Sequence, residues 1–378
     1  MRGRIRFVLV LGIVLLVLLS ACESKPATTK VPQPTSPAQA TCPPAPTCPP
    51  AQVQTQPPAP TGEDRLSIVL ARGKLICGVN GGLPGFSFLD ESTGQFSGFD
   101  ADFCRVLAAA LFDDPNAVEF RPLSTQDRGP ALQTGEIDVL IRNTTWTSSR
   151  DATWGDFAPT TFYDGQGMMV RKDLGVTTLE ELANATICVQ SGTTTELNLT
   201  DQMRARNVPF TPVVFEEIDP TYAAYEQGRC DAVTSDRSQL AARRTVFANP
   251  DEHMIMDIVM SKEPLGPVVP HGGGIWFDVV KWCVYATFQA EEFGITSQNV
   301  GTFLASDKPE IRRFLGVEGE LGKNLGLAND FVVRIIRHVG NYGEIFDRNL
   351  GPNTPFQMAR GPNGLWTQGG LLYSPPFR

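Results

Sequence analysis

The feature that most constrains the fold of this chain is a repeated alternation of short apolar segments with amphipathic ones. In the first repeat we predict strands at "KLICGVN" (74–80) and "IDVLI" (137–141), with an apolar helical face in residues 98–112 between them. The second repeat, about 100 residues further on, has predicted strands at 185–190 and 229–236. This alternation is typical of an α/β fold with mostly parallel sheets flanked by helices. Two such units predict two lobes.

Two extended segments, residues 163–173 and 259–270, are expected to cross between the lobes. A chain that crosses out and returns makes a hinge, and ligands favour the cleft between two lobes. We therefore expect lobe 1 to comprise residues 63–165 and 267–378, which include the C-terminal helices, and lobe 2 to comprise residues 166–266.

The N-terminus has the pattern of an export leader. Three arginines lie within the first six residues, an apolar run of thirteen residues follows at 7–19, and "LSAC" ends at Cys22. A basic head, a short apolar body and small residues before the cleavage point are typical of a signal peptide, expected here over residues 1–21. The alternative is a transmembrane anchor, but the run is shorter than the ~20 residues that a membrane span needs.

"LSAC" resembles the lipobox of bacterial lipoproteins, which implies that Cys22 is lipidated and attaches the mature chain to the membrane. Residues 22–62 contain twelve prolines and almost no charged or aromatic residue. Because so few large apolar side chains cannot offset the entropy of ordering, we predict a disordered tether. Cys42 and Cys48 within it have either no role or a local or intermolecular disulfide.

The charge and the cysteines restrict the partners and the compartment. The formal net charge is −9, and it becomes about −12 once the three arginines of the leader are removed, which argues against nucleic acid as a partner. Export implies an oxidising setting, so four of the remaining five cysteines can pair. They are Cys77, Cys104, Cys188, Cys230 and Cys283. The sequence alone does not assign the pairs.

Polar patches follow three predicted strands, at the positions where open α/β sheets bind ligands. The first is "RNTTWTSSRD" (142–151), in which Arg150 offers a planar fork that fits a carboxylate. The alternative is a surface arginine paired with Asp151. Hydroxyl groups that can donate to the same anion belong to Thr144, Thr145 and Thr147.

The second patch is "SGTTTE" (191–196). Thr193 followed by Glu196 is a capping box, which is the simpler interpretation. The free N–H groups of a helix N-terminus also bind anions, and Gly192 allows a ligand to approach the backbone closely.

The third patch is Asp236, a carboxylate at a strand end that can hold an ammonium group. The alternatives are a salt bridge with Arg237 or an N-cap for the following helix. Together, an arginine, a helix terminus and an aspartate form a receptor for a zwitterion, provided that every buried charge finds a partner. Phe86 either lies against the aliphatic part of such a ligand or packs in the core.

These segments also resemble a known family, the extracytoplasmic substrate-binding proteins of polar amino-acid ABC transporters, in their general L-amino-acid branch. The resemblance runs from about Arg72 to the C-terminus through "GVNGGLPGFS", "GEIDVLIRNTTWTSSRD", "CVQSGTTTELNL" and "YSPPFR", among others. It implies the type II periplasmic-binding-protein (Venus-flytrap) fold with two crossing strands as hinge. It also implies a monomer without cofactor or metal that binds a free L-amino acid and serves an ABC transporter permease.

The resemblance assigns roles to individual residues. Arg150 corresponds to the arginine that clamps the ligand α-carboxylate, Thr194 to the helix-start threonine that joins it, and Asp236 to the aspartate that takes the α-amino group. Asn80 and Phe86 fall on positions that contact the ligand side chain. The remaining matches to contact positions or their neighbours are Arg142, Asn143, Thr144, Thr145, Thr193 and Thr195.

Two departures from relatives that bind one basic amino acid argue against that specificity here. Those relatives have an acidic residue at the position of Asn80 and an aromatic one at Leu83. Arg142 instead favours acidic or amide side chains. The family layout also implies disulfides Cys77–Cys104 and Cys188–Cys230, one in each lobe.

Two other functions are alternatives to a receptor that delivers amino acids to a permease. Dehydratases for prephenate-like acids use the same fold, but catalysis would need a general acid or base in the cleft. His253, His271 and His338 lie outside the three patches, and no Cys/His spacing indicates a metal site. A sensor subunit would share the binding chemistry and differ only in its membrane partner. We therefore expect an extracytoplasmic lipoprotein, not an enzyme, with broad specificity for L-amino acids.

Overall fold

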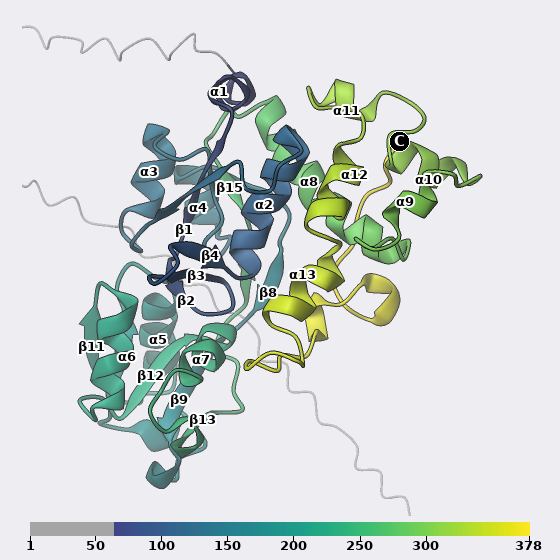
Figure 1. Cartoon of the computed structure of the whole chain (residues 1–378). Helices are drawn as coiled ribbons and strands as arrows, with labels where there is room; N and C mark the ends of the chain where they lie inside the picture. The colour runs from purple at the N-terminus through teal and green to yellow at the C-terminus, as the bar shows by residue number, and fades with distance from the viewer. Residues whose placement is uncertain (1–63) are drawn as a thin grey trace, which may run out of the picture. The chain divides into compact units, whose positions relative to one another are not determined.

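The computed structural model describes residues 64–378 (Figure 1). The predicted leader (1–21), the lipidation candidate Cys22 and the proline-rich segment to residue 62, with Cys42 and Cys48, lie outside the described residues. Within 64–378, no helix combines the length and the hydropathy that a membrane span requires.

The first sheet has five strands in the order β5-β1-β6-β15-β7. β1 pairs in parallel with β5 and β6, whereas β15 runs antiparallel to both of its neighbours. Four of the five strands therefore point in one direction. Their bounds are β1 Leu75–Val79, β5 Val118–Pro122, β6 Val139–Leu140, β7 Asp156–Phe157 and β15 Val268–Val269.

The second sheet repeats this plan in the order β11-β10-β12-β9-β13, and its fourth strand is again the antiparallel one. The prediction of two α/β lobes is confirmed, although each sheet is mixed. We call the part built on the first sheet lobe 1 and the part built on the second lobe 2. The bounds are β9 Gln166–Arg171, β10 Thr186–Gln190, β11 Thr211–Phe215, β12 Ala232–Asp236 and β13 His253–Ile255.

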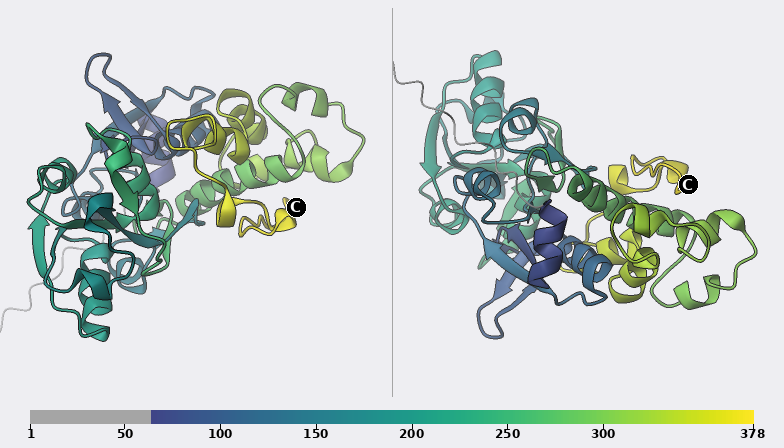
Figure 2. Two further views of the ribbon diagram at one scale, coloured as in Figure 1. Left: turned by 90° about the horizontal axis from the view of Figure 1, so that it is seen from below. Right: turned by 90° about the horizontal axis from the view of Figure 1, so that it is seen from above.

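Helices flank both sheets. Those in contact with the second sheet are α5 Thr194–Ala205, α6 Ile218–Glu226 and α7 Arg237–Arg244. In lobe 1, α2 packs on β1, and the C-terminal helices α8, α12 and α13 pack against α2 or against one another (Figures 1 and 2). The lobe 1 helices named here are α2 Phe99–Phe112, α3 Arg128–Thr134, α4 Ser148–Thr153, α8 Ile275–Glu292, α12 Phe331–His338 and α13 Tyr342–Asn349.

Two short strands, β8 (Phe162–Asp164) and β14 (Glu263–Leu265), pair antiparallel and carry the chain between the lobes, which confirms the predicted crossing. The C-terminal segment holds β8 in place. The Tyr342 hydroxyl donates to the carbonyl of Thr161 (2.8 Å), and Asn363 bonds both the N–H and the C=O of Tyr163 (2.6 and 3.1 Å). In an edge strand, alternate residues direct their backbone N–H and C=O groups away from the sheet. At Tyr163 the side chain of Asn363 bonds these two groups in place of a neighbouring strand.

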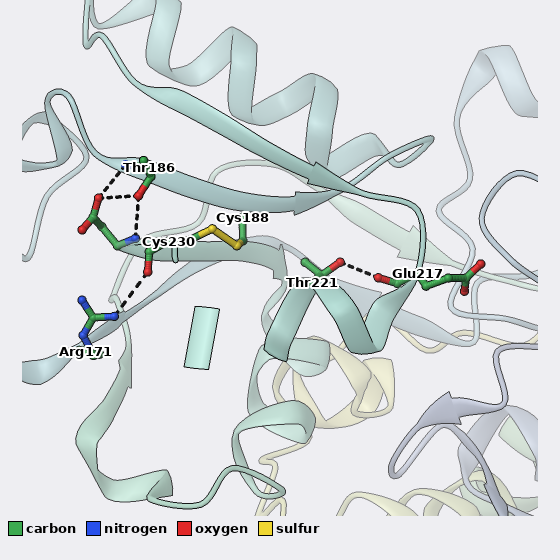
Figure 3. The surroundings of a disulfide bond; sticks show 7 residues. Arg171, Thr186, Cys188, Glu217, Thr221 and Cys230 are labelled. Atoms are coloured by element: carbon green, nitrogen blue, oxygen red, sulfur yellow. Dashed lines mark hydrogen bonds between the residues drawn. A yellow bond between two sulfur atoms is a disulfide. The ribbon is translucent and has the colours of Figure 1, made fainter. Parts of the chain in front are cut away.

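Both disulfides implied by the family resemblance are present. Cys77–Cys104 joins β1 to α2, and Cys188–Cys230 joins β10 to the turn before β12, while Cys283 is free and buried on α8. Figure 3 shows the surroundings of the second bond, including Thr186. The Asp231 carboxylate accepts from the N–H and the hydroxyl of Thr186, each at 2.7 Å. These hydrogen bonds hold the pKa of Asp231 below its usual range.

Removal of the Cys188–Cys230 bond should destabilise lobe 2. The bond closes a loop between residues 42 positions apart, and loss of such a constraint on the unfolded chain costs about 3–4 kcal/mol. We expect the double variant Cys188→Ala/Cys230→Ala to show this loss in urea unfolding. Cys283→Ala, which breaks no disulfide, is the control. Non-reducing peptide mapping that finds four free thiols at 77, 104, 188 and 230 would contradict the pairing.

Candidate functional site

A small enclosed cavity lies where the carboxyl ends of parallel strands from both sheets meet. Its lining comes from the segments that follow β5 and β6 in lobe 1 and β10 and β12 in lobe 2, as expected for open α/β sheets. The lining residues are Thr125, Arg128, Arg142, Asn143, Thr145, Arg150, Gln190, Thr193, Thr194, Thr195, Ser235, Asp236 and Gln239. Eight of them were among the eleven ligand-contact residues predicted from the sequence.

Hydrogen bonds between the lobes close the cavity. Asn143 in lobe 1 donates its Nδ2 to Oε1 of Gln239 in lobe 2 (3.1 Å), and the Thr125 hydroxyl donates to the carbonyl of Ser191 (2.9 Å). The enclosed volume is about 20 Å3, which is room for roughly one water molecule. A larger ligand can therefore enter only when the lobes move apart.

Arg150 is held with its guanidinium inside the cavity and is not paired with Asp151. Thr147 caps α4 by accepting from the backbone N–H of Arg150 (3.2 Å), which fixes where the side chain starts. The guanidinium lies 4.8 Å from the ring centre of Trp154 and donates Nη1 to the carbonyl of Thr145 (3.1 Å). Burial lowers the pKa of Arg150. The carboxylate of Asp151 accepts from the backbone of Phe157 instead (3.3 Å).

Asp236, at the end of β12, presents an unsatisfied carboxylate. The side chain is 5% exposed, and among the described residues its Oδ1 has no hydrogen-bond partner. Both structural alternatives are wrong: α7 has no side-chain cap, and Arg237 donates to the carbonyls of Met256 and Ile258. Burial, aided by the charges of Asp164 and Glu263, raises the pKa of Asp236 well above its ordinary value. An ammonium group would satisfy this carboxylate.

Arg128 is a cavity residue that the sequence analysis missed. It opens α3, is 3% exposed, and has an Nε without a partner. Its guanidinium lies 5.4 Å from the ring centre of Trp154, the same side chain that Arg150 contacts. Burial, together with the positive charges of Arg142 and Arg150, lowers the pKa of Arg128. The segment after β5 lies at the same edge of the sheet as the other polar patches. Because ligands bind at the carboxyl ends of the strands, the position of Arg128 after β5 was a signal in the sequence.

The lining is rich in positive charge. Arg142 donates Nε to the carbonyl of Leu123 (2.8 Å), and burial lowers its pKa to about 10. Within 64–378, no ion pair neutralises any of the three lining guanidiniums or Asp236. The lining thus carries three cationic groups and one carboxylate, which favours a ligand with more than one negative group.

A buried aspartate positions the polar loop of lobe 1. The "GGLPGF" turn (81–86) supplies the carbonyl of Phe86 to the N–H groups of Asp100 and Ala101 at the start of α2, so the Asp100 side chain does not cap this helix. Its Oδ2 accepts instead from the N–H of Asn143 (2.8 Å), a residue with the uncommon positive φ of 32°. Gly98 is required beside this turn, because a Cβ there would lie 2.3 Å from the Phe86 oxygen.

The threonines at the start of α5 combine capping with lining. Thr193 caps the helix by accepting from the N–H of Glu196 (3.1 Å), but the Glu196 carboxylate accepts from Gly192 (3.0 Å), so the predicted capping box is incomplete. The Thr194 hydroxyl donates to Glu263 (2.8 Å) and lies 3.3 Å from the Thr145 hydroxyl of lobe 1. Capping and cavity lining are therefore compatible in one segment.

Three predicted contact residues do not line the cavity. Asn80 lies behind it and donates Nδ2 to Asn143 (3.3 Å), and Thr144 is buried with its hydroxyl on the carbonyl of Arg142 (2.9 Å). Phe86 is fully buried and packs edge-on against Phe99 and Phe162, so the core-packing alternative applies. Its contribution is to the aromatic core under the hinge.

A larger groove of about 810 Å3 lies elsewhere, between the crossing strands, α7 and the C-terminal residues 358–371. It is mostly apolar and contains none of the unsatisfied buried polar atoms found in the described chain. The unsatisfied polar groups therefore favour the small cavity, and not the groove, as the ligand site. No group of three or more His, Cys, Asp or Glu side chains within residues 64–378 is arranged to hold a metal ion.

Comparisons with known proteins show which family this chain resembles. Residues 75–264 match the model of bacterial extracellular solute-binding proteins, family 3. The general L-amino acid-binding periplasmic protein AapJ of Rhizobium johnstonii is 53% identical over 83% of this chain and 92% of its own length. The glutamate/glutamine/aspartate/asparagine-binding protein BztA of Rhodobacter capsulatus is 50% identical over 83% and 93%.

Among solved structures, a periplasmic binding protein from Brucella ovis with glutathione bound is similar with a TM-score of 0.82. It is 51% identical in sequence, and the match covers 84% of this chain and all of the other one.

The buried Asp100 should make stability depend on pH. Burial raises its pKa to about 6, so the folded chain keeps a proton that the unfolded chain releases above about pH 4. The contribution of Asp100 to the free energy of unfolding therefore falls between about pH 4 and 6. As the pH rises from about 4 to 6, the free energy of unfolding of Asp100→Asn should increase by on the order of 2 kcal/mol relative to that of wild type. Urea unfolding at each pH measures this difference.

The asparagine keeps an oxygen that can accept from the N–H of Asn143. Asp114→Asn, at an exposed position, serves as the control and should follow wild type at each pH. A difference between Asp100→Asn and wild type that stays constant from pH 4 to 7 would contradict this prediction.

Proposed function

The chain belongs to the bacterial extracellular solute-binding proteins of family 3, and we propose that it captures free L-amino acids with broad specificity and delivers them to the permease of an ABC transporter. The observation that carries this proposal is a pair of unpaired opposite charges, Arg150 and Asp236, one from each lobe. The α-carboxylate of a zwitterion would pair with the first and its ammonium with the second. Because every amino acid has both groups, these contacts admit many side chains.

The surplus of positive charge suggests which side chains bind most tightly. Arg150 accounts for the α-carboxylate, which leaves Arg128 and Arg142 to meet the ligand side chain. A side-chain carboxylate would balance their charge, and an amide would accept their hydrogen bonds. The names of the relatives fit this preference, since one includes glutamate, glutamine, aspartate and asparagine, and a neighbour holds glutathione.

Family membership places the globular part outside the cytoplasm. We further propose that lipidated Cys22 attaches the chain to the membrane, that residues 22–62 act as its tether, and that the protein works as a monomer. The support for lipidation is the "LSAC" sequence after the leader.

Binding without catalysis is the better supported role, because the relatives at about half identity are named as binding proteins. A sensor subunit that presents amino acids to a receptor would use the same cavity. The two roles separate when the membrane partner is isolated, since a transporter partner would hydrolyse ATP.

Loss of Arg150 should weaken ligand binding strongly. Arg150→Ala leaves the ligand carboxylate unpaired in the cavity, which costs at least about 2–3 kcal/mol. Calorimetric titration of residues 63–378 with L-glutamine should therefore show a loss of affinity of about thirtyfold or more. Arg121→Ala, at a half-buried arginine outside the cavity, is the matched control. A loss under threefold would remove Arg150 from the site.

Arg128 should act selectively on acidic ligands. Arg128→Gln removes one positive charge near the ligand side chain, so affinity for L-glutamate should fall about tenfold, or about 1.4 kcal/mol. Affinity for L-alanine should change less than about threefold, because its side chain carries no charge. Equal losses for the two ligands would show that Arg128 supports the cavity without selecting the side chain.

A further inference from the structure

Glu263 lies next to the cavity but belongs to none of the segments that the sequence singled out as ligand-binding. It is the first residue of the crossing strand β14, and it is 1% exposed. Its Oε2 accepts from the hydroxyl of Thr194 (2.8 Å), and its Oε1 accepts from Nδ2 of Asn198 (2.8 Å) and from the Ser261 hydroxyl. The crossing strand is thus tied by one carboxylate to the first two turns of α5.

These contacts fix the direction of a chain of hydroxyl groups. The Thr194 hydroxyl has a single proton, and it donates this proton to Oε2 of Glu263. The Thr194 oxygen can then only accept on its cavity side, where the Thr145 hydroxyl of lobe 1 lies at 3.3 Å. The hydrogen bonds therefore run from Thr145 to Thr194 to Glu263, across the interface between the lobes.

We propose that Glu263 is a positioning residue for the amino-acid site, an inference that rests on the proposed function. By taking the Thr194 proton, it makes the Thr194 oxygen an acceptor for lobe 1. The ligand carboxylate then meets α5 through the main-chain N–H groups of Thr194 and Thr195, since the next N–H group, that of Glu196, donates to Thr193. Thr194 serves the clamp through its backbone, and its hydroxyl joins the two lobes.

The position of Glu263 on the hinge gives this role its physical basis. Two residues further along β14, Leu265 forms a bridge with Thr145, whose hydroxyl lies against Thr194. One short strand therefore holds the Thr145 backbone on the lobe 1 side and the Thr194 hydroxyl on the lobe 2 side. The two hydroxyls come together in the closed arrangement because the same strand positions both residues.

A double-mutant cycle tests the proposal. Glu263→Gln offers Thr194 an amide that can donate, which reverses the direction of the hydroxyl chain, and we expect about a tenfold loss of affinity for L-glutamine. In a Thr194→Val background the same change should cost less than about twofold, because its target is already gone. Calorimetric titration of wild type, the two single variants and the double variant gives the coupling free energy between Glu263 and Thr194.

Asn198→Ala provides a matched control, since it removes the partner of the other carboxylate oxygen and leaves Thr194 untouched. It should change the melting temperature but keep the affinity within about twofold. Equal losses from Glu263→Gln in both backgrounds, or an equal loss in Asn198→Ala, would show that Glu263 is a structural tie only and overturn the proposal.

A further pair of variants covers the case in which Glu263→Gln fails to fold. Thr194→Ser keeps the hydroxyl and should retain more affinity for L-glutamine than Thr194→Val, which should lose about tenfold. Wild-type affinity in both would overturn the proposal. If the wild-type protein binds neither L-glutamine nor L-alanine, the proposed function itself fails, which is distinct from any result within the cycle.

Discussion

The closed arrangement depends on buried charges that side chains within residues 64–378 do not neutralise. Arg150 and Asp236 face one cavity from opposite lobes, and Arg128 and Arg142 add positive charge that no ion pair in this part of the chain offsets. An uncompensated buried ion costs several kcal/mol, and this cost falls when the lobes part and water enters. Closure is therefore most favourable around a molecule of complementary charge. Ligand capture and lobe closure are parts of one equilibrium, which the hinge makes available.

The topology explains why opposite charges end up on opposite lobes. Parallel strands of both sheets direct their carboxyl ends at the cleft, so each lobe contributes the polar residues that follow its own strands. The chain also enters each sheet from the cleft, through β8 or β14. A strand that starts at the cleft must run antiparallel to the strands that end there. β9 and β15 are these antiparallel strands, and each is the fourth strand of its sheet. The mixed sheets are a consequence of the crossing.

The same topology separates what the sequence could predict from what it could not. Arg150 and Asp236 were predictable because polar side chains directly after apolar strands mark the cleft. Arg128 was not recognised because it opens a short helix and carries no local pattern of its own, and its place after the end of β5 was the one signal that marked it. Phe86 was placed at the ligand by resemblance, but its role depends on Phe99 and Phe162, which pack against it from other parts of the chain. The Glu263–Thr194 contact spans 69 residues, and only the folded crossing brings these side chains together.

The two crossing strands are held by different parts of the molecule. β8 is fixed by Tyr342 and Asn363 from the C-terminal segment, and β14 is fixed through Glu263 by α5 of lobe 2. Because β8 and β14 are paired, a movement of α5 relative to the C-terminal helices strains one short sheet of three residues in each strand. The family match ends at residue 264, so the side chains that hold β8 lie outside it. The stiffness of this hinge, and with it the balance between open and closed lobes, is therefore set in part by a segment beyond the common core of the family.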